Sequence, residues 1–485
     1  MKPESAATVS PLSEKEILSR FAHLLSAQGV EGIGSTIFFL YLAWLDVSVY
    51  GEVMYAMAAG SVLMKVVQFG LYYPLVSDIG SAEHDRAPEI LNRVNIIKLG
   101  LCAPCMAAIL GTILYRGFSI QMSLILALIS LGFALEGVAD TFFADFRVRG
   151  RQDKEARIKI VASVLSYGFG FGTAALGLNP VIISLFRLIS AAVKIWFGIS
   201  SYVKDYSAKI LTIPDWSSVW GVFRASVVFA LIEILGIVYN KTNIFFLESA
   251  TGVKGVAYYS AAWNLVDPVS ILASEQFLGW VIFPLLAGLW WKNRQSIGRI
   301  VKSNALWLVA LAFPIMFVLH TESELLIGLI YPTEYSDAVW MQKYLVWTIL
   351  LSFENNLFSY VMMVAGAATT LLGFTIGATA LNLLFNVVLV QPLGLEGGCL
   401  VIILTKLVMT VFTFAYCQIR FRFFKAGDFL FPGCLVGVCL GAFMLLKPLV
   451  TLQPAVVITL LIYLGVLFLV GPRFLGRLPG RQKGQ

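Results

Sequence analysis

The sequence predicts an all-α protein that crosses a membrane many times. Of its 485 residues, 59% are hydrophobic and 13% are charged. Soluble globular chains average about 45–50% apolar and about 25% charged residues, so this chain has too little polar surface to cover a folded body in water. This composition excludes a soluble enzyme and a disordered chain. It also excludes a nucleic-acid-binding protein, because the net charge of +7 forms no basic soluble module.

Fourteen apolar runs are long enough to cross a bilayer, since a helical span needs about 20 residues. The long eighth run contains Pro268, which predicts a kink there. The predicted spans are residues 21–45, 52–76, 95–115, 120–143, 158–178, 181–203, 221–246, 255–287, 301–320, 339–362, 369–391, 397–419, 431–449 and 453–472.

The basic residues between the spans predict the orientation. With a cytoplasmic N-terminus, 25 Lys and Arg residues face the cytoplasm, Lys98 among them, and only Arg116, Lys254 and Lys447 face outwards. Because the Lys and Arg bias of short loops sets topology, we expect both termini in the cytoplasm. The polar N-terminus predicts no removable signal peptide. The longest external segment, about 321–338, is acidic and too short for a separate domain.

An internal repeat predicts two related halves. Gly51 and Tyr55 follow one apolar run, and Gly255 and Tyr259 follow another at the same spacing. Six spans per half is an even number, so the halves insert in the same orientation, related by a pseudo-two-fold axis along the membrane normal. The predicted parts are an N-terminal lobe of residues 1–205, a C-terminal lobe of residues 206–425, and spans 13 and 14 with a tail in residues 426–485.

Charged residues inside the predicted spans are the candidate functional groups. Each one at the bilayer centre costs about 2.5–3.5 kcal/mol, so these residues either form ion pairs or line a wet cavity. A cavity lined by cations from both halves suits an anionic cargo, such as a lipid-linked sugar whose pyrophosphate cannot cross hydrocarbon bare. The basic residues are Lys65, Arg187, Lys194, Arg224, Lys241, Lys343 and Lys406, and the acidic residues are Glu31, Glu136, Asp140, Glu233, Asp267, Glu275 and Glu354.

The cysteines predict neither a disulfide framework nor a metal site. All six lie in apolar runs, where thiols behave as small hydrophobic groups. Cys102 and Cys105 have the spacing of a redox or metal pair, but no second Cys or His pair accompanies them in the sequence. We therefore predict no metal and no cofactor.

Short motifs follow one another along nearly the whole chain. They are Phe39-Leu40, Tyr50-Gly51, Tyr55-Ala56, Arg149 to Gln152, Lys241 to Leu247, Gly255, Tyr259, Ile327 to Tyr331, Glu334-Tyr335, Asn382, Asn386, Pro392, Gly394, Gly397 and Gly398. Together these motifs resemble bacterial polysaccharide flippases for O-antigen or exopolysaccharide, within the multidrug/oligosaccharidyl-lipid/polysaccharide exporter superfamily. Two departures are Asn243, where members often carry aspartate, and Lys241, where arginine is common.

The resemblance implies two six-helix bundles that move an undecaprenyl-pyrophosphate-linked oligosaccharide across the bacterial inner membrane by alternating access, driven by an ion gradient. It also implies lipid and substrate as partners, with a polysaccharide polymerase and chain-length proteins as further candidates. We hypothesise that the pyrophosphate ligands are Lys65, Arg187, Arg224 and Lys241. A desolvated carboxylate can couple transport to protons or ions, and the candidates are Glu31, Glu233 and Glu354.

Three other functions stay open on the sequence alone. An ion-coupled multidrug or small-solute exporter of the same superfamily fits the acidic residues but favours acidic over basic cavities, since its cargo is usually cationic. A membrane-embedded polymerase or ligase fits poorly, because the external loops are short and there are only three histidines. A scaffold within a synthase complex would tolerate loss of the buried cations. No catalytic residue is predicted.

Overall fold

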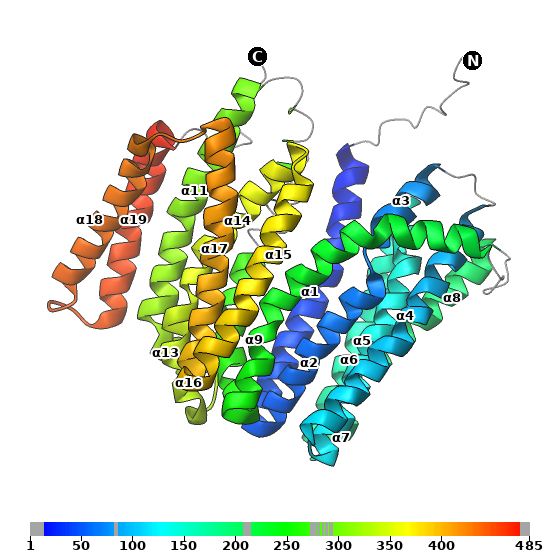
Figure 1. The fold of residues 1–485 in the computed structure, drawn as a ribbon. Coiled ribbons are helices and arrows are strands. Elements are labelled where there is room, and N and C mark those ends of the chain that lie inside the picture. The colour runs from blue at the N-terminus through cyan, green and yellow to red at the C-terminus, as the bar shows by residue number, and fades with distance from the viewer. Residues whose placement is uncertain are drawn as a thin grey trace, which may run out of the picture. The chain divides into compact units, whose positions relative to one another are not determined.

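The computed structural model describes residues 14–81, 86–206, 215–271, 278, 282–283, 286, 290 and 294–475, and these residues form helices and no strand (Figure 1). The chain divides into two compact units, Met1–Ile237 and Val238–Gln485, with the boundary inside one long helix. The predicted lobe limits and their pseudo-symmetry stay predictions. The predicted termini, residues 1–13 and 476–485, lie outside the described residues.

The first unit is built around α5, which packs against α2, α4 and α8, while α6 packs against α1 and α8. Its helices are α1 (Glu14–Leu45), α2 (Val47–Gln68), α3 (Tyr72–Ser81), α4 (Ala87–Arg116), α5 (Ile120–Val148), α6 (Gln152–Ala175), α7 (Pro180–Ile183), α8 (Phe186–Tyr206) and the first part of α9 (Trp216–Ile271).

The second unit is built around α17, which packs against α13, α14 and α15. Its helices after α9 are α11 (Arg294–Thr321), α12 (Ser323–Ile330), η3 (Thr333–Tyr335), α13 (Ser336–Leu345), α14 (Trp347–Val364), α15 (Ala368–Phe385), η4 (Asn386–Val390), α16 (Gln391–Leu393), α17 (Leu395–Phe421), η5 (Ala426–Phe429), α18 (Leu430–Leu446) and α19 (Leu452–Phe474).

The predicted all-α membrane fold is confirmed. Eleven of the described helical segments are long and apolar enough to cross a bilayer. Where the structure describes them, the predicted spans lie on helices, apart from the end of the second span. The count of eleven is lower than fourteen because it takes two predicted spans as one in α9 and leaves out α1 and the α13–α14 pair. The eighth predicted span, 255–287, is described as far as Ile271 and at a few later positions.

Helix α9 begins with a capped first turn and contains, further along, the turn between two predicted spans. Asp215 precedes its first turn and accepts hydrogen bonds from the hydroxyl and backbone N–H of Ser217 and from the N–H of Ser218, which hold the pKa of its carboxyl below the ordinary value. Gly252, with φ of 70°, then interrupts the helical backbone. This left-handed conformation favours glycine, so the chain turns between residues 246 and 255 as predicted.

The predicted C-terminal boundary of the second span, 52–76, is wrong. Helix α2 stops at Gln68, because Phe69 and Gly70 both take positive φ values, 45° and 59°, and the chain restarts as α3. A Cβ at Gly70 would come within 2.7 Å of the Phe229 side chain, so glycine is also needed for this close approach. Lys65 therefore lies in the last turn of α2 and not in the middle of a span.

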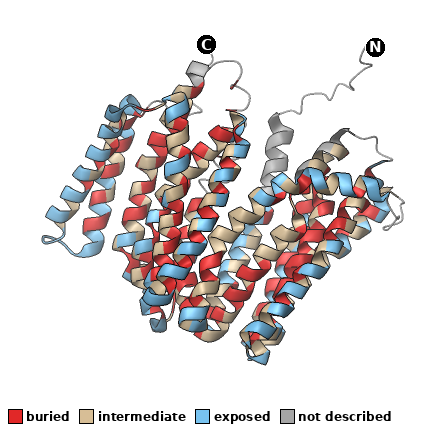
Figure 2. Cartoon of the chain, viewed as in Figure 1, coloured by how far each residue is buried: buried red, intermediate tan, exposed pale blue. Residues whose placement is uncertain are grey.

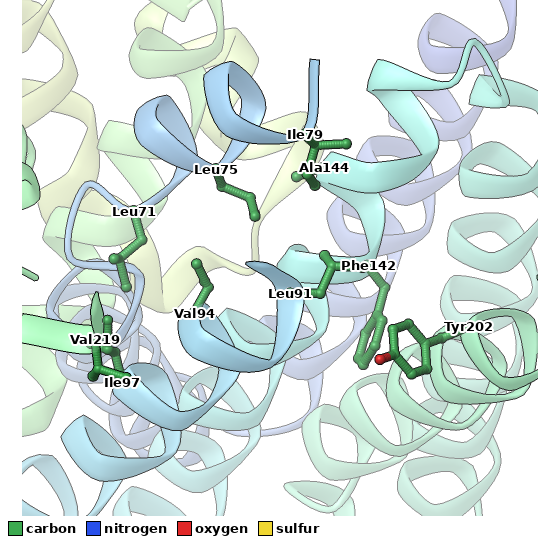
Figure 3. Close-up of a cluster of buried hydrophobic side chains, with 10 residues drawn as sticks. All are labelled: Leu71, Leu75, Ile79, Leu91, Val94, Ile97, Phe142, Ala144, Tyr202 and Val219. Atoms are coloured by element: carbon green, nitrogen blue, oxygen red, sulfur yellow. The ribbon is translucent and has the colours of Figure 1, made fainter. Parts of the chain in front are cut away.

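Each unit has its own apolar core. In the first, Leu71, Leu75, Leu91 and Phe142 meet Tyr202, joining α3, α4, α5 and α8 (Figure 3). Buried residues follow one stripe of most helices and exposed apolar residues the other (Figure 2). Such a chain needs lipid around it, since large apolar surfaces on that scale do not face water.

The α18–α19 hairpin packs against α11 in the second unit (Figure 1). Trp307 and Leu306 of α11 meet Leu435 and Tyr463 in a buried cluster. The Tyr463 hydroxyl donates to the carbonyl of Ala310 at 2.8 Å, so this aromatic ring is both buried and satisfied.

Candidate functional site

A cluster of four charged side chains lies in the first unit, and we name it the Glu136 cluster: Glu31, Glu136, Arg187 and Lys194. Arg187 and Lys194 are seven residues apart on α8, which puts them on one face two turns apart. Both bond the carboxylate of Glu136 on α5, and Lys194 lies 3.5 Å from Glu31 on α1. Two cations and two anions are therefore brought together from three helices.

Three of the four residues of the Glu136 cluster are buried. Glu136, Arg187 and Lys194 are at most 7% exposed, and the Arg187 guanidinium lies 3.8 Å from the centroid of the Phe133 ring. Gly132 permits this approach, since a Cβ there would lie 2.8 Å from Cγ of Arg187. Arg187, predicted to hold phosphate, is thus occupied by a carboxylate in this conformation.

A second polar network surrounds the end of α2. Lys65 lies 3.3 Å from Glu233 of α9, with 39% of its side chain exposed, and Gln68 donates to Asp140 of α5. Lys98 of α4 is buried and donates to the carbonyl oxygen of Gly137 at 2.8 Å. The structure brings together Lys65 and Glu233, two residues predicted for different roles. It corrects the placement of Lys98, which is not a loop cation.

Two other predicted cations lie on α9. Arg224 is exposed, and it follows Phe223, whose ring stacks on Phe69 with centroids 4.5 Å apart. Lys241 is half-buried in the second unit. Arg224 therefore belongs to the first unit and Lys241 to the second.

Lys406, in the middle of α17, is the buried cation of the second unit. It is 8% exposed, and its Nζ donates to the Ser352 hydroxyl of α14 at 2.6 Å. The Nζ also lies 5.0 Å from the Trp263 ring centroid, and Asp267 and Lys241 act on it electrostatically over a longer range. Within the described residues, Lys406 has no carboxylate within ion-pair distance. Its position inside a span was visible in the sequence, but its neutral partners were not.

Glu354 on α14 is a predicted carboxylate with an unpartnered oxygen atom. Its Oε1 atom is buried and has no hydrogen-bond partner among the described residues. The next residue, Asn355, accepts from the Thr413 hydroxyl at 3.3 Å, so the helix itself is tied to α17. Glu354 is therefore a free acceptor inside the second unit.

The buried asparagines bond to the protein itself. Asn243 donates to the Tyr259 hydroxyl at 2.6 Å, Asn382 donates to the Thr405 hydroxyl at 2.9 Å, and Asn386 donates to Asn382 at 3.0 Å. All three asparagines are fully buried. The Asn382 bond joins α15 to α17, which is the ordinary role of amides in membrane bundles, and the other two bonds lie within α9 and within the α15–η4 segment.

The basic segment after α5 is neutralised by carboxylates. Arg147 binds Glu155 through two nitrogens at 2.6 and 2.8 Å, and Lys159 binds the same carboxylate at 2.8 Å. Arg151 bonds Asp205, which links α6 and α8. Only Lys and Arg count in the topology rule, so this network leaves the predicted orientation unchanged.

No group of three or more His, Cys, Asp or Glu side chains in the described part of the chain could hold a metal ion. Cys102 and Cys105 are free thiols.

Residues 44–340 match the family described as polysaccharide biosynthesis protein, which is more than half of the chain. The chain belongs to this family. Over 304 residues it is 22% identical to the "Probable low-salt glycan biosynthesis flippase Agl15" of Haloferax volcanii, covering 62% of this chain and 63% of the relative. The chain thus spans less than two thirds of the length of the curated relative that it matches. The predicted family is confirmed.

Solved structures show the same fold. The "inward closed conformation" of the lipid II flippase MurJ has a TM-score of 0.73 at 12% identity, covering 94% of this chain and 100% of that one. An inward-facing MATE multidrug transporter of the MOP superfamily has a TM-score of 0.62 at 15% identity, covering 83% and 98%. At these identities the likeness establishes the fold alone. The protein is a multi-pass membrane protein with the fold of MOP superfamily transporters.

Proposed function

We propose that this protein flips a lipid-linked oligosaccharide, carried on undecaprenyl pyrophosphate, across the membrane by alternating access. Its family and the printed function of its Haloferax relative support a role in glycan export. The observation that carries the proposal is Lys406, a buried cation in the middle of a span with only neutral direct partners. A charge there costs about 2.5–3.5 kcal/mol, and an anionic passenger would offset this cost.

In this proposal Lys65, Arg224 and Lys241 bind the pyrophosphate together with Lys406. Arg187 would join them only by exchanging Glu136 for phosphate, since the two now form a buried ion pair. Among the proposed coupling carboxylates, Glu354 has a free buried oxygen, whereas Glu31 and Glu233 lie beside Lys194 and Lys65.

The remaining parts of the proposal concern the cell. The protein works without catalysing a reaction, in a bacterial inner membrane, with both termini in the cytoplasm. Polysaccharide polymerase and chain-length proteins are its proposed partners. Glycosyltransferase genes beside its coding region would support polysaccharide export over drug export.

The test is complementation of a deletion strain. The variants Lys406→Gln, Lys65→Ala and Arg224→Ala should abolish surface polysaccharide while the protein level in the membrane stays normal. Lys447→Gln, which changes an exposed cation, is the matched control and should export normally. A flipping defect leaves the lipid-linked repeat units on the inner leaflet, whereas a polymerase defect leaves single repeat units on the outer face. Full export by all three variants would contradict the proposal.

A second candidate is an ion-coupled multidrug exporter. The MATE likeness of the fold and the free acceptor of Glu354 favour it. In that case the deletion strain should become sensitive to cationic drugs and keep its surface polysaccharide.

A further inference from the structure

A pocket lies directly after α17, where this span ends. Its volume is about 520 Å³, and its lining residues are Gln418, Ile419, Arg422, Phe424 and Lys425. Helix α17 is a candidate span that ends at Phe421, so the pocket lies where the hydrocarbon core gives way to the headgroup region. None of these residues belongs to the proposed transport site.

The backbone of this pocket is held in place by its own hydrogen bonds. Arg422 takes a left-handed conformation with φ of 53°, and its N–H donates to the carbonyl of Gln418 at 2.9 Å. The Gln418 side chain then donates to the carbonyl of Phe424 at 2.8 Å and accepts from its N–H at 3.0 Å. A non-glycine residue at positive φ is uncommon, so these bonds impose the turn that presents Arg422.

The charged ends of the pocket are available to a ligand. Arg422 and Lys425 are exposed, and neither forms an ion pair within the described residues. The nearby Asp428 carboxylate feels the charge of Lys425 but is bonded by Lys302, and it accepts from the Lys425 backbone N–H at 2.8 Å. The turn is thus fixed through its main chain while both cationic side chains keep their hydrogen-bond donors.

The rest of the pocket is apolar. Ile419 is 80% exposed at one wall. Phe424 is buried at the other, with its ring 6.0 Å from Phe358 and 5.5 Å from Phe429. A ligand that fills this pocket therefore has an anionic group for the two cations and a hydrocarbon part for Ile419 and Phe424.

We propose that this pocket binds the phosphate of an anionic membrane lipid, with Arg422 and Lys425 as its ligands and the first acyl carbons against Ile419. A guanidinium matches two phosphate oxygens at once, and basic residues at a membrane surface attract anionic headgroups. The lipid is an annular partner that anchors the end of α17, and its binding does not depend on the transported cargo.

The experiment uses the full chain in nanodiscs of phosphatidylcholine with increasing phosphatidylglycerol, and it measures lipid retention by native mass spectrometry. The wild type should retain phosphatidylglycerol selectively. The Arg422→Gln/Lys425→Gln double variant should bind it about 20- to 30-fold more weakly. The single variant Arg420→Gln, an exposed arginine of the same helix outside the pocket, is the matched control and should bind like the wild type.

Two results of these lipid measurements would overturn the proposal. One is equal retention of phosphatidylglycerol and phosphatidylcholine by the wild type. The other is an Arg420→Gln loss as large as that of the double variant, since general surface charge would then explain the binding. Two separate arms add inorganic phosphate, one to discs that contain phosphatidylglycerol and one to discs of phosphatidylcholine alone. Displacement of retained phosphatidylglycerol only at phosphate concentrations far above those of the lipid supports a lipid site. Saturable binding of phosphate alone, with no preference for the lipid, assigns the pocket to a free anion and contradicts the lipid proposal.

Discussion

Two glutamates inside helices, one in each unit, have opposite surroundings. Glu136 of α5 is bonded by both Arg187 and Lys194, whereas Glu354 of α14 has a buried oxygen with no partner among the described residues. The carboxylate of Glu136 lies between two cations of α8 and so holds α5 and α8 together. A carboxylate without a cation stabilises nothing by pairing and is available to a proton or a small cation. The same type of side chain therefore joins helices in one unit and has an unpaired oxygen in the other.

The largest effect is expected from Glu136→Gln. This change leaves Arg187 and Lys194 without their shared partner, and breaking a buried pair costs about 3–5 kcal/mol. Thermal or denaturant unfolding of the detergent-purified protein measures the loss. Glu89→Gln is the control, since Glu89 pairs with Arg93 one turn away on the same helix with 53% of its side chain exposed, and it should cost about 0.5 kcal/mol or less. An unchanged free energy of unfolding for Glu136→Gln would show that the Glu136 cluster does not stabilise the fold.

Gly132→Ala tests the same cluster through its packing. The new Cβ would lie 2.8 Å from Cγ and 2.9 Å from the carbonyl carbon of Arg187, so α8 must shift. Overpacking of this kind costs about 1–3 kcal/mol, read from the unfolding midpoint. Gly168→Ala on α6 meets nothing within 4 Å and should be neutral or slightly stabilising. Equal behaviour of the two variants would mean that α5 and α8 are not in close contact at this point.

Glu354→Gln tests the unpaired carboxylate of the second unit. Because Glu354 has no ionic partner to lose, the free energy of unfolding should change by less than about 1 kcal/mol. Export of polysaccharide should nevertheless fall about tenfold or more if Glu354 couples transport to an ion gradient. Both quantities are measured on the same variant. Normal export would remove Glu354 from the coupling proposal, and a large loss of stability would show a hidden structural role.

The smallest effect is expected from Tyr259→Phe. It removes the hydroxyl that accepts from Asn243 and leaves the ring in place. Hydrogen bonds between membrane helices average about 0.6 kcal/mol, so a slight fall in the unfolding temperature is expected, with normal export. A loss of export at normal stability would instead give this buried pair a part in transport.

Much of the fold was predictable from local sequence. Where the structure describes them, the apolar runs form helices, because in lipid every backbone N–H and C=O must be satisfied within its own segment. Gly252 and Gly394 mark turns for the same local reason, since both take positive φ values. The end of α2 was missed because Phe69, a bulky residue, adopts a left-handed conformation that its type does not predict.

The candidate site was predictable only as a set of residues. Hydropathy showed that Lys65, Arg187, Lys241 and Lys406 lie within apolar runs. The cost of placing such a charge in the bilayer can be judged from the residue itself and from the apolar residues around it in the sequence. Their partners are set by which helices pack together. Glu136 lies 51 residues before Arg187 and 58 before Lys194, and Ser352 lies 54 before Lys406. The sequence alone determined that these charges need compensation. Only the tertiary structure decided which carboxylate, hydroxyl or ring supplies it, because an ion pair depends on a separation of a few ångströms in space and not on the distance along the chain.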